Sequence, residues 1–557
     1  MRRALIFALV AAGCGSDSSP ATPTPDAPVS APDAPGPDAQ TSDLVVTLDD
    51  GRVQADLVGD TTKVRRFLKI PFAKPPIGDL RWKAPQRPDP WSDVRHETDF
   101  SAPCVQAPNL QNAGSTEEDC LYLNIWTPEP APANAPVMFW MHGGGNMTGS
   151  AGDKLPVPGL TPDQQPQFYD GQFFAAKQGV VLVSINYRVG VMGFYPDTRL
   201  AGEQSPVGNQ GLLDQRFAMQ WVHDNIARFG GDPGNVTIFG ESAGSFDVCF
   251  HMAAPGSRGL FHKAIGESGG CTAGLRPAPT PSDATVVAKL AAFTQALGCG
   301  GAADPLACLR GKPAAAVLAA VTGDEDAFVP VIDGAGGTLP EEPEALFDRG
   351  DVAQVPYLLG SNTNEGRLFT YPLLLAGTAP HDQPSYVASL TAFFGPLAGQ
   401  VAAEYPASDY GDVNATGTSA YFDALSDAFG DSGLVCGTHD TARRAAAAGL
   451  HVFMYNFNVP WSIAPSILLA SHAAEIGHVF NDPWMPDAAS QMVSDTMNGY
   501  WAHFARTGDP SFSAAPAWPA FAPDAADHDV RLQLDPGFEV LHDFKKDKCE
   551  FWRSLYR

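Results

Sequence analysis

The sequence predicts an α/β fold in which helices cover both faces of a large, mostly parallel sheet. Three observations support this prediction. A β-prone run ends in Gly-Glu-Ser-Ala-Gly at residues 240–244 and continues as a helix-compatible segment, a second apolar run ends in a glycine loop, and two later apolar runs lead into polar loops. In open α/β sheets, ligands lie at the carboxyl ends of the strands. We therefore expect the functional residues in the loops that follow these runs.

Residues 236–240 form the predicted strand of the first observation, and Ser242 follows it closely. A sharp strand-to-helix turn would lift the serine hydroxyl clear of the sheet, and small residues two positions on either side leave room for the backbones that meet there. Gly-x-Ser-x-Gly also occurs by chance in glycine-rich turns. Because a strand precedes it here, we interpret Ser242 as a nucleophile.

The second apolar run, residues 137–141, is followed by His142 and three glycines. Backbone amides without a nearby Cβ are well suited to bind an oxyanion. We expect donors from Gly144 and Gly145, and a third from Ala243, which directly follows the serine. A flexible glycine turn is the alternative interpretation.

A serine hydroxyl is a weak nucleophile, so it requires a base and an acid that orients the base. Residues 355–360 predict a strand that leads to Glu365. Residues 451–457 predict another strand, followed after a longer excursion by His472. An isolated Glu or His is more often structural, but the order Ser, Glu, His is that of an α/β-hydrolase triad.

These motifs and the stretches between them resemble the type-B carboxylesterase family, which also includes cholinesterases, fungal lipases and neuroligins. The resemblance runs from about residue 44 to the C-terminus, and its clearest stretches are 70–76, 80–82, 118–126, 186–188, 208–215, 257–262, 328–334 and 504–510. It implies an α/β-hydrolase fold and a set of site residues: Ser242 as nucleophile, Glu365 as acid, His472 as base, Gly144, Gly145 and Ala243 as oxyanion hole, and Ser268 near the acid.

The resemblance also implies two structural ion pairs, Arg81 with Glu118 and Arg188 with Asp232.

One position departs from the family pattern. The family usually has glycine after the catalytic histidine, and this chain has Ala473. His478 competes with His472 for the role of base, but it lies beyond Glu475, which anchors the alignment.

The N-terminus resembles a bacterial secretory signal. A basic start, a short apolar run at residues 4–12 and small residues before Cys14 indicate a signal peptide (1–14) that ends in a lipobox. Ala11 replaces the usual leucine, so plain secretion is the alternative to lipidation of Cys14. Residues 15–43 are rich in Pro, Ala and Asp and predict a disordered linker. Residues 44–557 are the predicted catalytic domain.

Of the nine cysteines, setting Cys14 aside leaves eight, an even number that suits export and disulfides. The resemblance implies three disulfides, and exclusion leaves a fourth: Cys104 with Cys120, Cys299 with Cys308, Cys436 with Cys549, and Cys249 with Cys271. The spacing fits no zinc site, so we expect no metal, and the chemistry requires no cofactor.

The formal net charge of −27 argues against binding to nucleic acid or to anionic lipid surfaces, because both require basic patches. Membrane contact is expected only through the N-terminal lipid anchor. The sequence leaves the oligomeric state open.

The loop between Cys104 and Cys120 is short and polar, and it contains no aromatic residue. This argues against a cation-π site in the loop and against a large apolar lid. The expected function is therefore that of an exported serine carboxylesterase, which hydrolyses small-molecule esters of short to medium acyl chains through an acyl-enzyme. A neuroligin-like surface binding protein and a true lipase are the alternatives.

Overall fold

The computed structural model describes residues 44–556, except residues 158–159, 162–163, 204–206, 273–277, 322–326, 412–416, 481–484, 486 and 523–528. The predicted signal peptide with Cys14 and the predicted linker 15–43 lie outside the described residues.

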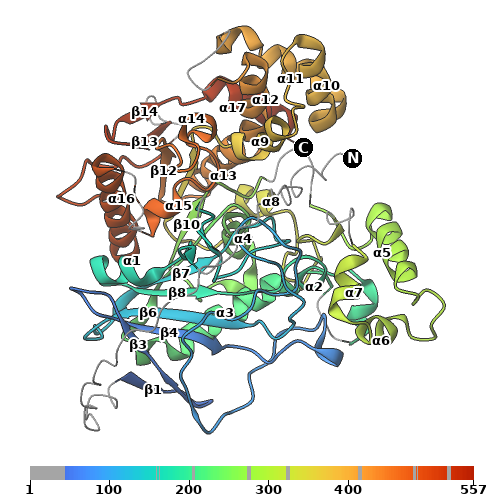
Figure 1. Ribbon diagram of the computed structural model, residues 1–557, viewed down its shortest axis with the longest axis vertical. Coiled ribbons are helices and arrows are strands. Elements are labelled where there is room, and N and C mark those ends of the chain that lie inside the picture. The colour runs from blue at the N-terminus through green and yellow to red at the C-terminus, as the bar shows by residue number, and fades with distance from the viewer. Residues whose placement is uncertain are drawn as a thin grey trace, which may run out of the picture.

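An 11-stranded sheet forms the centre of the described fold (Figure 1). Every pairing from β8 to β13 is parallel, and antiparallel strands complete the sheet at both edges. In spatial order the strands are β14 (Val540–His542), β13 (Val530–Leu534), β12 (Val452–Phe457), β11 (Tyr357–Asn362), β10 (Lys263–Glu267), β9 (Gly231–Glu241), β7 (Ala135–Met141), β8 (Val181–Ile185), β6 (Tyr122–Pro128), β4 (Val64–Pro71) and β3 (Asp56–Val58). A separate three-stranded sheet contains β1 (Val45–Thr47), β2 (Arg52–Gln54) and β5 (Val94–Arg95).

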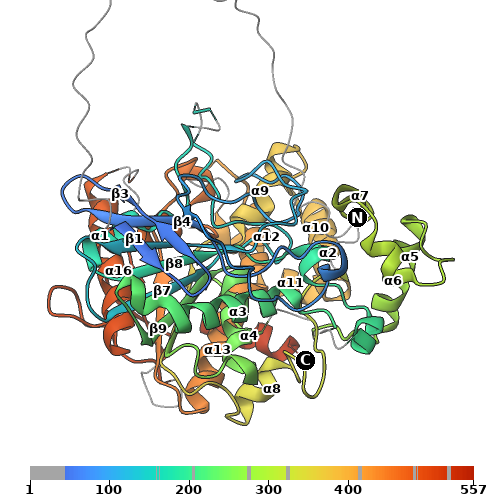
Figure 2. The same cartoon turned by 90° about the horizontal axis from the view of Figure 1, so that it is seen from below.

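Helices cover both faces of the large sheet, as Figure 2 shows. On one face lie α1 (Gly171–Gln178) and α16 (Ala488–Thr507), and on the other lie α3 (Gln210–Asn225), α4 (Ala243–Ala253), α8 (Pro343–Asp348) and α13 (Cys436–Ala447). The predicted α/β architecture is confirmed.

The sequence of β7 shows why this sheet needs helices on both sides. Side chains alternate between the faces of a strand, and in β7 both sets are apolar and buried. Phe139 packs in the core shared with α3, α4 and α13, whereas Trp140 packs in the core shared with α1 and α16. An open face would expose a row of large apolar groups to water.

Further helices complete the described fold, and the short helix at Ile476–Val479 packs with α16 in the core on the first face. They are α2 (Gly190–Gly193), α5 (Ala284–Ala296), α6 (Pro305–Arg310), α7 (Ala314–Ala319), α9 (Arg367–Leu375), α10 (Gln383–Phe394), α11 (Ala398–Glu404), α12 (Ala420–Gly430), α14 (Pro465–Leu468), α15 (Ile476–Val479) and α17 (Lys546–Leu555), with short 3-10 helices and a π-helical turn at Asp431–Val435. The stretch Gln383–Glu404 is long and apolar enough to cross a membrane, by length and composition alone. This is weak evidence, because α10 buries Tyr386, Leu390 and Phe394 in a core with α12 and α17.

The described residues contain the four expected disulfides: Cys104–Cys120, Cys249–Cys271, Cys299–Cys308 and Cys436–Cys549. Disulfides of this number are consistent with export into an oxidising compartment.

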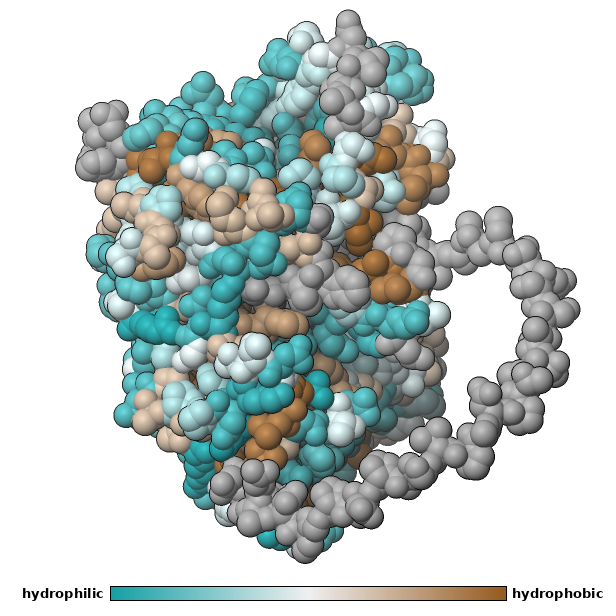
Figure 3. Space-filling view, turned by 60° about the vertical axis from the view of Figure 1, so that its left-hand side comes forward, coloured by the Kyte–Doolittle hydropathy of each residue, from teal (hydrophilic) through white to brown (hydrophobic). Residues whose placement is uncertain are grey.

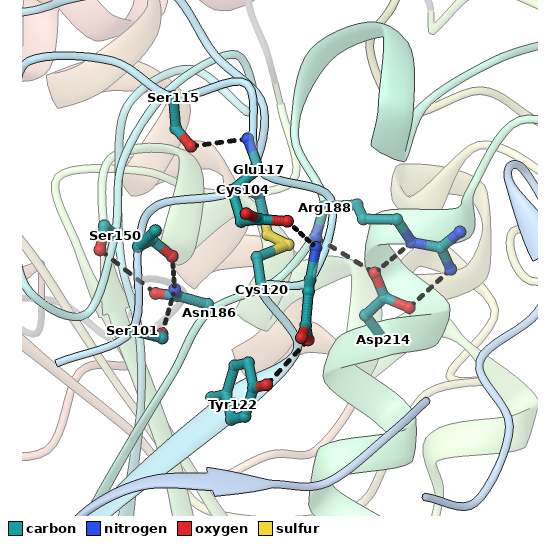
Figure 4. The surroundings of a disulfide bond; sticks show 12 residues. Ser101, Cys104, Ser115, Glu117, Cys120, Tyr122, Ser150, Asn186, Arg188 and Asp214 are labelled. Carbon is teal, nitrogen blue, oxygen red and sulfur yellow. Dashed lines mark hydrogen bonds and ion pairs between the residues drawn. A yellow bond between two sulfur atoms is a disulfide. The ribbon is translucent and has the colours of Figure 1, made fainter. Parts of the chain in front are cut away.

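One predicted ion pair is confirmed and the other is wrong. Arg81 Nε donates to Glu118 at 2.8 Å. Arg188, however, pairs with Asp214 on α3 through two hydrogen bonds of 2.7 Å, as Figure 4 shows beside the Cys104–Cys120 disulfide. Arg188 follows the carboxyl end of β8, whereas Asp232 lies at the amino end of β9. The two strands run in the same direction, so Asp232 lies at the opposite edge of the sheet.

Candidate active site

Ser242 occupies a strained turn between β9 and α4. Its φ is 56° and its ψ is −121°, and its backbone N–H donates to Glu267 O at 2.9 Å. A non-glycine residue in this conformation is costly, and the cost is typical of a nucleophile elbow. A Cβ on Gly244 would lie 2.1 Å from the carbonyl oxygen of Met141, so the turn requires glycine there.

Glu365 and His472 meet beside this turn. Glu365 lies in the loop after β11, and its Oε2 is 2.7 Å from His472 Nδ1. Its other oxygen accepts from the backbone N–H of Asn362 at 2.7 Å. A carboxylate on Nδ1 keeps the proton there and leaves Nε2 free to accept one. Both side chains are buried. The structure therefore brings together the predicted acid and base.

The far side of the His472 ring faces Glu241, the residue directly before Ser242. Nε2 lies 3.1 Å from Glu241 Oε1. Our sequence reasoning did not predict this contact. The sequence did contain a sign of it, because Glu241 is a charged residue at the end of a buried strand and such a residue needs a partner.

These contacts change the protonation of both groups. Burial works against a charged imidazole, but the carboxylates of Glu241 and Glu365 outweigh it and raise the pKa of His472 to about 9. Burial likewise raises the pKa of Glu241 to about 8, although the attraction of His472 opposes the rise. The resting site therefore holds its protons more tightly than an exposed Glu–His pair would.

Glu241→Gln should shift the pH profile of kcat/KM to lower pH. The base acts when neutral, so kcat/KM rises with pH through the pKa of His472 in the free enzyme. Removing the Glu241 carboxylate removes a cause that raises this pKa. The measurement is the apparent pKa of the acidic limb, with the exposed Glu341→Gln as a control that should not shift it. An unchanged or higher pKa in Glu241→Gln would contradict the expectation.

Ser268 reaches the acid indirectly. Its hydroxyl donates to Glu475 Oε1 at 3.1 Å, and Glu475 Oε2 accepts from the side-chain amide of Asn362 at 2.5 Å. The backbone of Asn362 in turn donates to Glu365. Burial, followed by the proximity of Glu365, raises the pKa of Glu475 to about 7. This buried chain fixes the loop that carries the acid.

His478 lies away from the acid. Its ring packs against Phe457 at 4.9 Å between centroids, and burial lowers its pKa to about 4. In the described part of the chain, the histidine that contacts Glu365 is His472.

The glycine loop lies against the serine turn. A Cβ on Gly143 would be 3.2 Å from Ser242 Cβ. Gly144 has a φ of +100°, and a Cβ there would lie 2.2 Å from Thr148 O, so the loop excludes side chains at this position. The amides of Gly144, Gly145 and Ala243 have no hydrogen-bond acceptor within the described part of the chain. They are free to serve as donors.

Aromatic side chains reach the base from segments outside the Cys104–Cys120 loop. The ring of Phe369 on α9 lies 4.9 Å from that of His472, and Trp461 Nε1 donates to His472 O at 3.3 Å. Sequence reasoning missed both. Ala473 keeps a left-handed backbone, with φ 66°, despite its Cβ.

Within the described ranges, no group of three or more His, Cys, Asp or Glu side chains is arranged to hold a metal ion. A mostly parallel sheet, a strained serine turn after β9 and an acid and base after later strands define the α/β-hydrolase class.

Comparisons with known proteins identify the family within this class. Residues 42–552 match the Carboxylesterase family. The chain is 34% identical over 536 residues to an acetylcholinesterase from Bungarus fasciatus, covering 88% of this chain and 83% of the relative. It is 32% identical over 553 residues to a cholinesterase from Mus musculus, covering 92% and 87%. The chain therefore belongs to the carboxylesterase family, and this membership supports carboxylic ester hydrolysis as its activity.

Proposed function

We propose that the protein is a serine carboxylesterase with Ser242, His472 and Glu365 as its catalytic triad. The observation that carries the proposal is the 2.7 Å contact between His472 Nδ1 and Glu365 Oε2, formed beside the strained turn that presents Ser242. The order of the three residues along the chain is that of α/β-hydrolases.

In this mechanism Ser242 Oγ attacks the ester carbonyl while His472 Nε2 takes the hydroxyl proton. Nε2 must exchange its contact with Glu241 for one with the next residue, Ser242. The amides of Gly144, Gly145 and Ala243 bind the oxyanion. His472 then gives the proton to the leaving alcohol, and Glu365 stabilises the charged imidazole. Water activated by the same histidine releases the acid from the acyl-enzyme.

The test is hydrolysis of chromogenic esters by the purified protein, together with labelling by an organophosphate. We expect turnover that stops when one equivalent of phosphoryl group is found on Ser242 by mass spectrometry. A neuroligin-like binding protein would show neither turnover nor labelling, and that result would refute the proposal.

The substrates proposed are dissolved, uncharged esters of short to medium acyl chains. The Cys104–Cys120 loop exposes one large hydrophobic side chain, Leu110 (54%), and no aromatic ring. On the face in Figure 3, hydrophobic residues form small, separate areas. Interfacial activation requires apolar surface that a lid can open onto lipid. These features favour an esterase over a lipase.

The rate should therefore rise hyperbolically with ester concentration and show no jump at the solubility limit. Each extra methylene of the acyl chain adds only about 0.8 kcal/mol of favourable binding free energy, and only where a pocket buries it. The measurement is an acyl-length series of 4-nitrophenyl esters, with emulsified long-chain triglyceride alongside. A sharp rise in rate on the emulsion would identify a lipase.

The names of the two relatives suggest choline esters as an alternative substrate. We propose that a neutral ester of the same shape is hydrolysed as fast as acetylthiocholine, because the loop lacks an aromatic ring that could hold the cation. A kcat/KM much higher for acetylthiocholine would favour the alternative.

We also propose that the protein is exported and anchored by a lipid on Cys14, with plain secretion as the alternative. The disulfides support export, and the acidic charge supports contact with the membrane through this anchor alone. Mass spectrometry of the mature N-terminus tests the anchor, because an unmodified N-terminal peptide would exclude lipidation.

A further inference from the structure

The three proposed oxyanion donors come from two separate segments. Gly144 and Gly145 lie in the loop after β7, whereas Ala243 is the first residue of α4. Oxyanion stabilisation requires donors held at hydrogen-bond distance from one point, and a misplacement of about 1 Å can cost about 10²-fold in rate. The loop must therefore be fixed relative to the helix.

A buried side-chain pair makes this connection. Asn146 directly follows Gly145, and its Nδ2 donates to Asp247 Oδ1 at 2.9 Å. Asp247 lies on α4, about one turn after Ala243. Asn146 is 4% exposed and Asp247 is 0% exposed. The backbone oxygen of Asn146 also accepts from Gly190 N at 2.6 Å, which fixes the end of the loop.

Asp247 is itself anchored by the neighbouring helix. Its Oδ2 accepts from Gln215 Nε2 on α3 at 2.6 Å, and Gln215 Oε1 is 2.8 Å from His251 Nε2. His251 Nδ1 is 2.8 Å from Ser257 Oγ. All these side chains are buried. Asp247 therefore has little freedom to move away from Asn146.

The other end of the glycine loop is held as well. The Tyr187 hydroxyl donates to His142 O at 2.7 Å, and the two rings stack with centroids 4.2 Å apart. Asn146 and Asp247 then supply the link at the far end. A buried carboxyl group is costly unless it is well hydrogen-bonded, so a simpler apolar contact would have served packing alone.

We propose that Asn146 and Asp247 are positioning residues that hold the Gly144 and Gly145 amides in register with that of Ala243. The inference rests on the proposed serine esterase function. It assigns neither residue a contact with substrate, and it predicts an effect on transition-state binding rather than on substrate binding.

The test uses Asn146→Ala and Asp247→Ala in the full-length enzyme, with the double variant. Each should lower kcat by about 10- to 100-fold and leave KM within about twofold. The affinity for a trifluoromethyl ketone, which forms a tetrahedral adduct with Ser242, should fall by the same factor as kcat/KM. The double variant should be no worse than Asp247→Ala, because that single variant has already lost the link between Asn146 and Asp247.

Asp247→Asn should keep most of the activity that Asp247→Ala loses. Asn146 Oδ1 has no partner among the described residues, so its amide can rotate and accept from the new side-chain N–H. Tyr386→Phe is the control, because it removes a buried hydrogen bond to Tyr405 O in the separate core of α10, α12 and α17. It should leave kcat and inhibitor affinity unchanged.

Three outcomes would overturn the inference. In the first, both alanine variants lose thermal stability but keep kcat and inhibitor affinity, as for a merely structural pair. In the second, Asp247→Asn is as defective as Asp247→Ala. In the third, the wild-type protein shows no hydrolysis or Ser242 labelling, which would refute the proposed function as well.

If Asp247→Ala does not fold, Asn146→Ala tests the same link without changing α4.

Discussion

Ser242→Ala and His472→Ala should each remove nearly all ester hydrolysis and leave the fold intact. In serine hydrolases the nucleophile and base act as a unit, and loss of either costs about 10⁶ in kcat. The side chains removed are small or partly polar and lie at a loop edge of the sheet, so the apolar cores on its two faces are not disturbed. The measurement is kcat on a 4-nitrophenyl ester, with the thermal midpoint as the check on folding.

Glu365→Gln should cost less, on the order of 10⁴ in kcat, because the base remains but its tautomer and charge lose their support. His478→Ala is the matched control, since His478 is also a buried histidine but lies beside Phe457. It should keep kcat near the wild-type value. If His478→Ala abolished activity and His472→Ala did not, the assignment of the base would be wrong.

The strands of the sheet and the position of the serine turn could be predicted from the sequence because local patterns determine them. A buried strand leaves an apolar run, and the residue that follows its carboxyl end must lie at the edge of the sheet. Ser242 and Glu365 follow such runs closely. His472 lies well beyond the end of β12, so the order of the triad and the family resemblance identified it, rather than a local pattern.

The contacts around the site were harder to predict from the sequence, because they join segments that are distant along the chain. Glu241 faces His472 across the turn, and Asn146 meets Asp247, although in each case the partners are far apart in the sequence. No periodicity encodes such a choice of partner. Ala473 is a milder example, since the sequence shows the missing glycine but not that the left-handed backbone, with φ 66°, is retained.

The incorrect partner of Arg188 has a different cause. Strand direction alone excludes Asp232, because the start of β9 and the end of β8 lie at opposite edges of the sheet. Asp214, on the helix that precedes β9, can reach the carboxyl edge. The correct pair was therefore within reach of topological reasoning.

Breaking the ion pair between Arg188 and Asp214 should have the largest effect on stability. Asp214→Ala should lower the free energy of unfolding by about 3–5 kcal/mol, the usual loss when a buried ion pair is broken and one charge remains. Arg188 is 2% exposed, and its guanidinium would stay buried without its two 2.7 Å hydrogen bonds to Asp214. The measurement is the urea midpoint at constant slope.

Glu341→Ala serves as the matched control, because it breaks an equally close but exposed pair with Arg349. Exposed pairs contribute about 0–1 kcal/mol, so its midpoint should barely move. Replacing both buried partners by apolar groups, Arg188→Met with Asp214→Leu, should recover most of the stability lost in Asp214→Ala, since no unpaired charge remains. If this double variant were as unstable as Asp214→Ala, the loss would arise from packing or from the other contacts of Arg188. Burial of an unpaired charge would then not be its cause.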